Sequence, residues 1–180
     1  ETEAIIADSI SKTFPTHRII GEEGGLISGP EDAEFEWVID PIDGTTNFTR
    51  QIPHFCISIA CLRNDILEHA IVIDPIRQEE FIASRGQSSK LNDKKIRVSQ
   101  LELLDGAVIA TGGRYPQQDM PGQAGLIQEL MSEGCTLRWP GSAALELAYV
   151  AAGRLDGLWM KNLKLWDMAA GALLIQEAGG

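Results

Sequence analysis

The sequence has few basic residues and no closely spaced cysteine pair. It carries 15 lysines and arginines against 26 acidic residues, a net charge of −11. A nucleic-acid-binding protein needs a basic face that replaces phosphate counterions, so we expect no direct contact with nucleic acid. Three cysteines without a C-x-x-C pair indicate a reducing, cytoplasmic setting. No signal peptide or membrane-spanning apolar run is present, and we therefore expect no membrane contact.

The 180 residues, 44% of them hydrophobic, are enough to build a substantial core. We expect an N-terminal α+β domain over 1–100 with an antiparallel sheet, and a C-terminal α/β domain over 101–180 that continues beyond the chain. The hydrophobic patterns predict strands at 17–20, 36–39, 55–62, 66–73, 81–84, 95–98, 107–110, 136–139 and 155–160. They predict helices at 1–14, 123–131, 143–152 and 167–178.

The stretch WVIDPIDGTTNF, residues 37–48, places two acids at the end of an apolar strand. Pro41 is expected to stop further pairing of that strand. Asp40, Asp43 and the Ile42 carbonyl between them then converge on one point, because Asp43 falls in the turn. An all-oxygen site of this kind is what Mg²⁺ prefers, and without a cation the two carboxylates would repel each other.

Gly44, Thr45 and Thr46 follow these acids directly. A helical turn starting here would offer free N–H groups to an anion such as phosphate, and metal ligands beside a phosphate site indicate phosphoryl chemistry. Asp-Pro and Asp-Gly are also ordinary turn dipeptides, and Asp or Thr can simply cap a helix. For this stretch alone, both interpretations stand.

Two further acids lie at element ends. Glu22 follows a predicted strand and is flanked by glycines, and Asp167 is expected at the first position of a helix that continues with Ala169, Ala170 and Gly171. Capping explains Asp167 equally well. The small residues after it allow close approach of a ligand or of another backbone. Acids from three separate segments, each at an element end, are what a metal cluster needs.

Three motifs in order carry a resemblance over nearly the whole chain: GEEGG (21–25), WVIDPIDGTTNF (37–48) and LWDMAAGALLIQEAGG (165–180). With GSAALELAYVAAGRLDG (141–157), the sequence resembles the inositol monophosphatase family, most closely its bacterial SuhB-type members. The resemblance implies a layered α/β/α/β/α sandwich of the type shared with fructose-1,6-bisphosphatase. It also implies Mg²⁺-dependent hydrolysis of small phosphate monoesters, above all inositol 1-monophosphate, by in-line attack of metal-activated water.

The site residues that the resemblance implies fall into three groups. Two or three Mg²⁺ ions, or Mn²⁺, would be bound by Glu22, Asp40, Asp43, Asp167 and the Ile42 carbonyl. The catalytic residues would be Glu22, Asp43 and Thr45. The substrate would be contacted by Gly44, Thr45, Gly141, Ser142, Ala143 and position 160. The resemblance further implies a lithium-sensitive homodimer.

Position 160 departs from the family pattern. The family places an acid that binds inositol hydroxyls seven residues before the last metal aspartate, and this sequence has Met160 there. A methionine cannot accept those hydrogen bonds. Histidinol phosphate or a 3′-phosphonucleotide therefore remains an alternative substrate, and SuhB-type proteins also suggest a partner in the transcription or ribosome-assembly machinery.

Overall fold

The structure is a computed structural model that describes residues 1–113 and 120–180. The larger sheet has the strand order β2-β1-β3-β4-β5-β6-β7-β8 and the smaller one the order β10-β9-β11. The strands of the larger sheet are β1 Arg18–Gly21, β2 Gly25–Ser28, β3 Phe35–Asp43, β4 Cys56–Arg63, β5 Ile66–Asp74, β6 Glu79–Ser84, β7 Gln87–Leu91 and β8 Lys94–Lys95. The smaller sheet contains β9 Val108–Gly112, β10 Thr136–Arg138 and β11 Gly157–Met160. The helices are α1 Thr2–Thr13, α2 Thr45–Thr49, α3 Met120–Ser132, α4 Ala143–Ala151 and α5 Leu165–Ala178.

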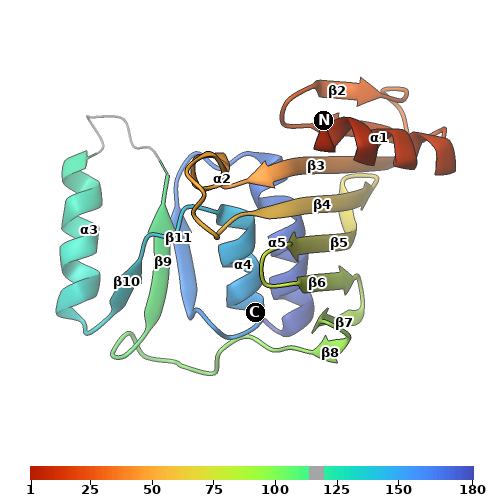
Figure 1. Cartoon of the computed structure of the whole chain (residues 1–180). Helices are drawn as coiled ribbons and strands as arrows, with labels where there is room; N and C mark the ends of the chain where they lie inside the picture. Colours follow the sequence, from red (N-terminus) through yellow and green to blue (C-terminus); the bar gives the residue numbers. More distant parts are fainter. Residues whose placement is uncertain (114–119) are drawn as a thin grey trace.

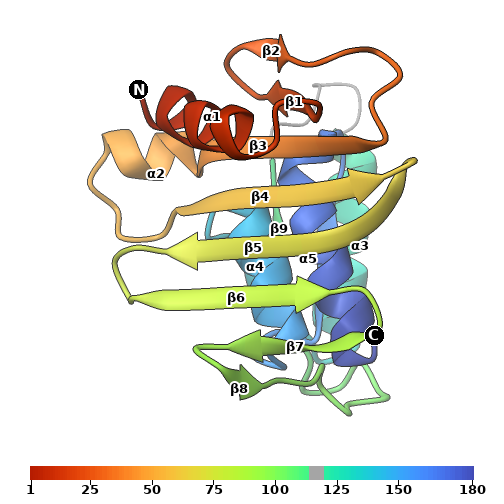
Figure 2. The same ribbon diagram turned by 90° about the vertical axis from the view of Figure 1, so that its right-hand side faces the viewer.

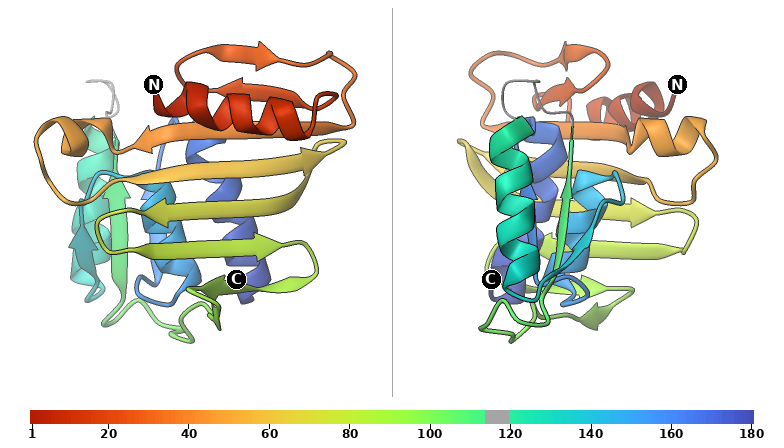
Figure 3. Two further views of the ribbon diagram at one scale, coloured as in Figure 1. Left: turned by 45° about the vertical axis from the view of Figure 1, so that its right-hand side comes forward. Right: turned by 90° about the vertical axis from the view of Figure 1, so that its left-hand side faces the viewer.

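These elements stack in five layers. Figures 1 and 2 show α1 on one face of the larger sheet and the pair α4 and α5 on the other. The smaller sheet follows behind that pair, and α3 covers its far side (Figure 3, right). This is the predicted α/β class in the predicted α/β/α/β/α order.

Helices α4 and α5 form the central layer because they are apolar on both sides. Val72 and Phe81 of the larger sheet join Leu145 and Leu173 of the helices in one buried cluster. Gly171 lets the two helices touch, since a Cβ there would lie 2.3 Å from the Cβ of Leu147. Of the two possibilities left open by the sequence, a ligand or another backbone close to these small residues, Gly171 therefore serves the second, the packing of α4 against α5. Both halves of the chain contribute to this cluster, and the predicted domain division at residue 100 stays a prediction.

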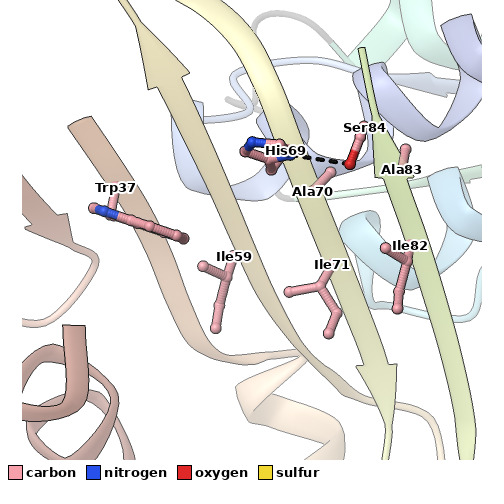
Figure 4. A pocket seen from close by; sticks show the side chains of 8 residues that line it. All are labelled: Trp37, Ile59, His69, Ala70, Ile71, Ile82, Ala83 and Ser84. Atoms are coloured by element: carbon pink, nitrogen blue, oxygen red, sulfur yellow. Dashed lines mark hydrogen bonds between the residues drawn. The ribbon is translucent and has the colours of Figure 1, made fainter. Parts of the chain in front are cut away.

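The opposite face of the larger sheet is only partly covered. Helix α1 packs over Ile19 and Ile39. Beyond it, Trp37, Ile59 and Ile82 line a shallow apolar hollow of about 190 Å³ that crosses four strands (Figure 4). Within the described ranges, no helix is long and apolar enough to cross a bilayer.

The structure corrects several predicted elements. Strands β1 and β3 are parallel, so the predicted antiparallel sheet is mixed. Strands β2 and β7 were not predicted, because GLIS is short and follows glycines and QSSKL is mostly polar. The strand predicted at 95–98 is wrong beyond its first residue, since β8 ends at Lys95. The Asn64-Asp65 hairpin turn is confirmed, with positive φ at both residues.

Candidate metal centre

The sequence predicted that strand pairing would stop at Pro41. Strand β3 instead continues through Pro41 to Asp43. It pairs Asp40 with Ser58 and then Asp43 with Cys56, so three steps on β3 match two on β4. The irregularity is a bulge that absorbs the proline. In a regular strand, residues three apart point to opposite faces, and the bulge instead turns Asp40 and Asp43 toward one another.

The predicted helical turn after these acids is confirmed as α2. Gly44 caps it with φ +91°, and a Cβ there would come within 3.2 Å of the Gly141 oxygen. Only glycine suits this conformation and this approach. The exposed Thr45 hydroxyl donates a hydrogen bond to the Ile42 carbonyl at 3.1 Å, which holds the predicted carbonyl ligand beside the acids.

Asp43 is bound at the N-terminus of α4. The Ser142 hydroxyl and the Ala144 N–H each donate to its Oδ2 at 2.7 Å, so the carboxylate takes the place of a helix cap. Burial raises the pKa of Asp43 to about 6, although these hydrogen bonds work in the opposite direction. The helix N-terminus likewise favours a negative charge here.

Asp167 occupies a similar place on α5. That helix begins at Leu165, two residues before the predicted start, so Asp167 is its third residue and not its first. Its carboxylate accepts the Lys164 N–H at 2.6 Å. Burial raises the pKa of Asp167, and the hydrogen bond from Lys164 opposes that rise. Asp167 therefore does help to cap α5, from the third position of the helix, which is the structural alternative to metal binding that the sequence left open.

The three aspartates Asp40, Asp43 and Asp167 form one cluster. One carboxylate oxygen from each lies within 4.8 Å of the others. Asp40 is 2% exposed, accepts the Ile42 N–H at 3.0 Å and caps no helix. Burial, followed by the charges of Asp43 and Glu22, raises the pKa of Asp40 to about 9. Such a set of oxygen ligands fits a hard divalent cation, whose charge would offset this repulsion.

Glu22 lies at the edge of the cluster. It follows β1 and donates its N–H to the Ile39 oxygen at 3.1 Å, and its carboxyl group lies near enough to Asp40 for the two to affect each other's pKa. Burial raises the pKa of Glu22, and the charge of Asp167 adds to the rise. Sequence reasoning missed the residue beneath this turn: the buried Glu3 of α1 accepts the Glu23 N–H at 3.0 Å. Glu3 could have been found from the sequence, because it is an acid on the apolar side of the first helix.

The predicted substrate residues split into two places. Gly141, Ser142 and Ala143 precede or begin α4 and lie beside Gly44, where Asn47 ties the Pro140 oxygen to the α2 loop with a 2.8 Å hydrogen bond. Met160 ends β11 and packs over Gly112, in an apolar hollow shared with Leu158 and Met168. Glu146 of α4, which sequence reasoning did not single out, is fully buried behind the Gly141–Ser142 turn.

A profile of the inositol monophosphatase family matches residues 1–180. "Nus factor SuhB" of Pseudomonas aeruginosa is 50% identical over 184 residues, which cover 99% of this chain and 67% of that protein. Its namesake in Escherichia coli is 48% identical over 179 residues, with the same shares covered.

Solved structures agree with these sequence matches. The extragenic suppressor protein suhB of Bartonella henselae superimposes with a TM-score of 0.94 at 42% identity, over 99% of this chain and 68% of that one. The inositol monophosphatase of Anabaena does so with a TM-score of 0.91 at 38% identity, over 98% and 70%.

Proposed function

The chain belongs to the inositol monophosphatase family, and on that premise we propose that it hydrolyses small phosphate monoesters with Mg²⁺, an inositol monophosphate being the preferred substrate. One observation carries the proposal: three carboxylate oxygens from β3 and α5 lie within 4.8 Å of one another. Capping explains Asp43 and Asp167, but not Asp40, whose pKa is raised to about 9 by burial and then by the charges of Asp43 and Glu22.

The proposed metal ligands are the predicted set: Glu22, Asp40, Asp43, Asp167 and the Ile42 carbonyl. A bound Mg²⁺ would neutralise charge on the phosphate oxygens and make a nearby water more acidic. Two helix N-termini and one bulge hold the three aspartates: α4 holds Asp43, α5 holds Asp167, and the bulge in β3 holds Asp40. Their hydrogen bonds to backbone N–H groups fix the oxygens before any ligand arrives, which is the preorganisation that electrostatic catalysis needs.

The proposed phosphate contacts are Gly44 and Thr45, at the bend between β3 and α2. Because Gly44 has no Cβ, this bend can pack against the backbone oxygens of His54 and Gly141, which holds the proposed phosphate contacts in place. We assign Glu22, Asp43 and Thr45 to the surroundings of the attacking water, which would be oriented by donating its two hydrogen bonds to side-chain oxygens of this group. Gly141, Ser142 and Ala143 would line the leaving-group side.

Met160 bears on which phosphate monoester is used. Its side chain covers Gly112 and offers no strong hydrogen-bond acceptor to a polyol. This keeps histidinol phosphate and 3′-phosphonucleotides as alternative substrates of the same chemistry. Restoring an acid with Met160→Glu is expected to shift preference toward myo-inositol 1-phosphate, and an unchanged ranking would remove Met160 from the specificity argument.

The test is phosphate release by the protein, with and without Mg²⁺, from myo-inositol 1-phosphate, histidinol phosphate and 3′-phosphoadenosine 5′-phosphate. Asp43→Asn should abolish Mg²⁺-dependent release. Asp65→Asn is the matched control, because it makes the same change in an exposed hairpin turn where asparagine is equally suitable. Folded protein that binds Mg²⁺ but releases phosphate from none of the three would refute the simple phosphatase proposal.

A second candidate function rests on the relatives' names. Several relatives that are 44–50% identical to this chain are named "Nus factor SuhB". We therefore propose that the protein also binds a component of the transcription machinery, as a homodimer. This role requires no catalysis, so Asp43→Asn should keep the partner in co-purification while phosphate release is lost. Loss of both together would tie the partner role to the metal site. Sedimentation velocity measures the dimer.

A further inference from the structure

Glu146 is a buried acid inside a helix of apolar residues. It is 0% exposed and follows Ser142 by one turn of α4. Its Oε1 accepts the N–H of Gly141 at 2.8 Å and that of Ser142 at 3.0 Å. Burying a carboxyl group costs several kcal/mol unless it is hydrogen-bonded, so a residue of this kind needs a reason to be there.

The turn that Glu146 holds is the one that contacts Asp43. With its N–H directed to Glu146, Ser142 points its hydroxyl to Asp43, 2.7 Å from Oδ2 and 3.3 Å from the backbone oxygen. Ala144, two residues on, donates its N–H to the same Oδ2. The chain of contacts therefore runs from Glu146 through two backbone N–H groups to Ser142 and Ala144, which make the two 2.7 Å hydrogen bonds to the Asp43 carboxylate.

The carboxyl group of Glu146 lies near the half-buried ring of His54. Among the described residues, neither Glu146 Oε2 nor His54 Nε2 has a hydrogen-bond partner, and His54 Nε2 lies 3.9 Å from Oε1. Burial raises the pKa of Glu146 to about 7 and lowers the pKa of His54. Oε1 makes no hydrogen bond to His54 and accepts the two backbone N–H groups instead.

We propose that Glu146 is a positioning residue for Asp43: by fixing the Gly141–Ser142 turn, it sets the orientation of a carboxylate in the three-aspartate cluster. Its effect on metal binding and catalysis rests on the function proposed above. Its effect on Asp43 does not, because the hydrogen bonds that carry it involve this chain alone. A purely structural role, stabilising the start of α4, would leave Asp43 in place.

The test uses Glu146→Leu, which fills the site without an acceptor, and Glu146→Gln, whose amide oxygen can accept the same two N–H groups. Glu146→Asp is a milder third variant, because its carboxyl is withdrawn by one methylene, in case the leucine variant does not fold. Ser89→Ala is the matched control for a lost buried hydrogen bond, since Ser89 is 0% exposed and donates to Leu174 instead.

Two readouts separate this inference from the proposed function. The first is the backbone amide resonance of Ala144, which reports its hydrogen bond to Asp43 without any metal. The second is Mg²⁺ affinity by calorimetry, together with kcat and KM for phosphate release. Losing an outer-shell partner typically costs about 10–100-fold in metal affinity, and we expect a loss in that range for Glu146→Leu and recovery to within about threefold for Glu146→Gln.

A shifted Ala144 amide in the leucine or aspartate variant, restored in the glutamine variant, is the expected result. The inference is overturned if the Gly141 and Ser142 amides shift while the Ala144 amide and Mg²⁺ affinity stay at the wild-type values. If wild-type protein binds no Mg²⁺ and releases no phosphate, the proposed function fails, and the Ala144 amide alone still decides whether Glu146 positions Asp43.

Discussion

The tetrapeptide Ile-Asp-Pro-Ile occurs twice in the chain, at 39–42 and at 73–76. Each copy lies at the C-terminal end of a strand, β3 or β5, and these two strands end at the same edge of the larger sheet (Figure 2). Both aspartates are buried, Asp40 with 2% and Asp74 with 0% of its surface exposed. The local sequence is the same, yet only one copy belongs to the acidic cluster.

The difference lies in the third residue after the aspartate. At the second corner this is Arg77, whose guanidinium donates to Asp74 at 2.7 Å while the N–H groups of Ile76 and Arg77 donate to the other oxygen. At the first corner it is Asp43, so Asp40 meets a second carboxylate instead of a cation. The comparison teaches that one turn supplies its own counter-charge, whereas the other has a second acid at that place, where we propose that a cation binds.

Asp40→Asn should give the largest effect. It removes a proposed metal ligand, and since the loss of outer-shell groups already costs about 10–100-fold, we expect Mg²⁺-dependent phosphate release to fall by at least about 100-fold. The same change should raise the melting temperature of metal-free protein, because a neutral amide can be buried without the proton uptake that the raised pKa of Asp40 implies. Steady-state kinetics and thermal unfolding in a chelator measure the two effects.

Asp74→Asn is the matched change at the other corner and should keep phosphate release within a few-fold of wild type, since Asp74 is bound by Arg77 and lies outside the cluster. If the two variants lost activity equally, the distinction between the corners would be wrong.

The metal-free protein should lose stability as the pH rises. The pKa of Asp40 is raised to about 9 and that of Asp43 to about 6, both above the ordinary aspartate value of 3.8. A raised folded-state pKa gives a contribution that is full at low pH and is lost as the pH rises through the folded value. For each group, the free energy of unfolding falls by at most on the order of 1.4 kcal/mol per pH unit.

Urea unfolding between about pH 5 and about pH 9 measures this fall. Adding Mg²⁺ should flatten the profile, because an ion that binds only the folded state stabilises it. Asp40→Asn should flatten its upper part. A metal-free profile that is level over this range would contradict the assigned repulsion.

The sequence singles out all three aspartates of the cluster, because each lies where a strand or helix pattern changes, and it adds Glu22, which lies outside the group of oxygens within 4.8 Å. It does not predict their relative geometry, which depends on a bulge at Pro41 and on α4, about 100 residues further along. It also places the start of α5 too late, since Lys164 is a poor cap by composition and Asp167 reaches back to it. Glu146 was detectable as an acid within an alanine-rich apolar helix, but its target is visible only in three dimensions.

Asp74→Asn should lower stability while sparing catalysis. Asparagine can still accept the two backbone N–H groups through its carbonyl, but it loses the charged contact with Arg77. The expected loss is about 1–3 kcal/mol in the free energy of unfolding, the usual cost of weakening a buried hydrogen-bonded group. Denaturant unfolding with phosphate release measured in parallel checks it. Unchanged stability would mean that the second corner does not depend on its own cation.

Arg77→Met should give the smallest effect of the series. The arginine is 41% exposed, so part of its charge is already screened by water, and it donates to both Asp74 and the Pro53 oxygen. We expect a loss of about 0.5–1.5 kcal/mol, partly reduced at high salt. Lys12→Met is the control, because its ion pair with Asp8 is well exposed and should contribute almost nothing. If Arg77→Met were as harmless as this control, backbone hydrogen bonds alone would be enough to hold Asp74. The absence of an arginine at position 43 would then no longer support the proposal that a cation binds at the first corner.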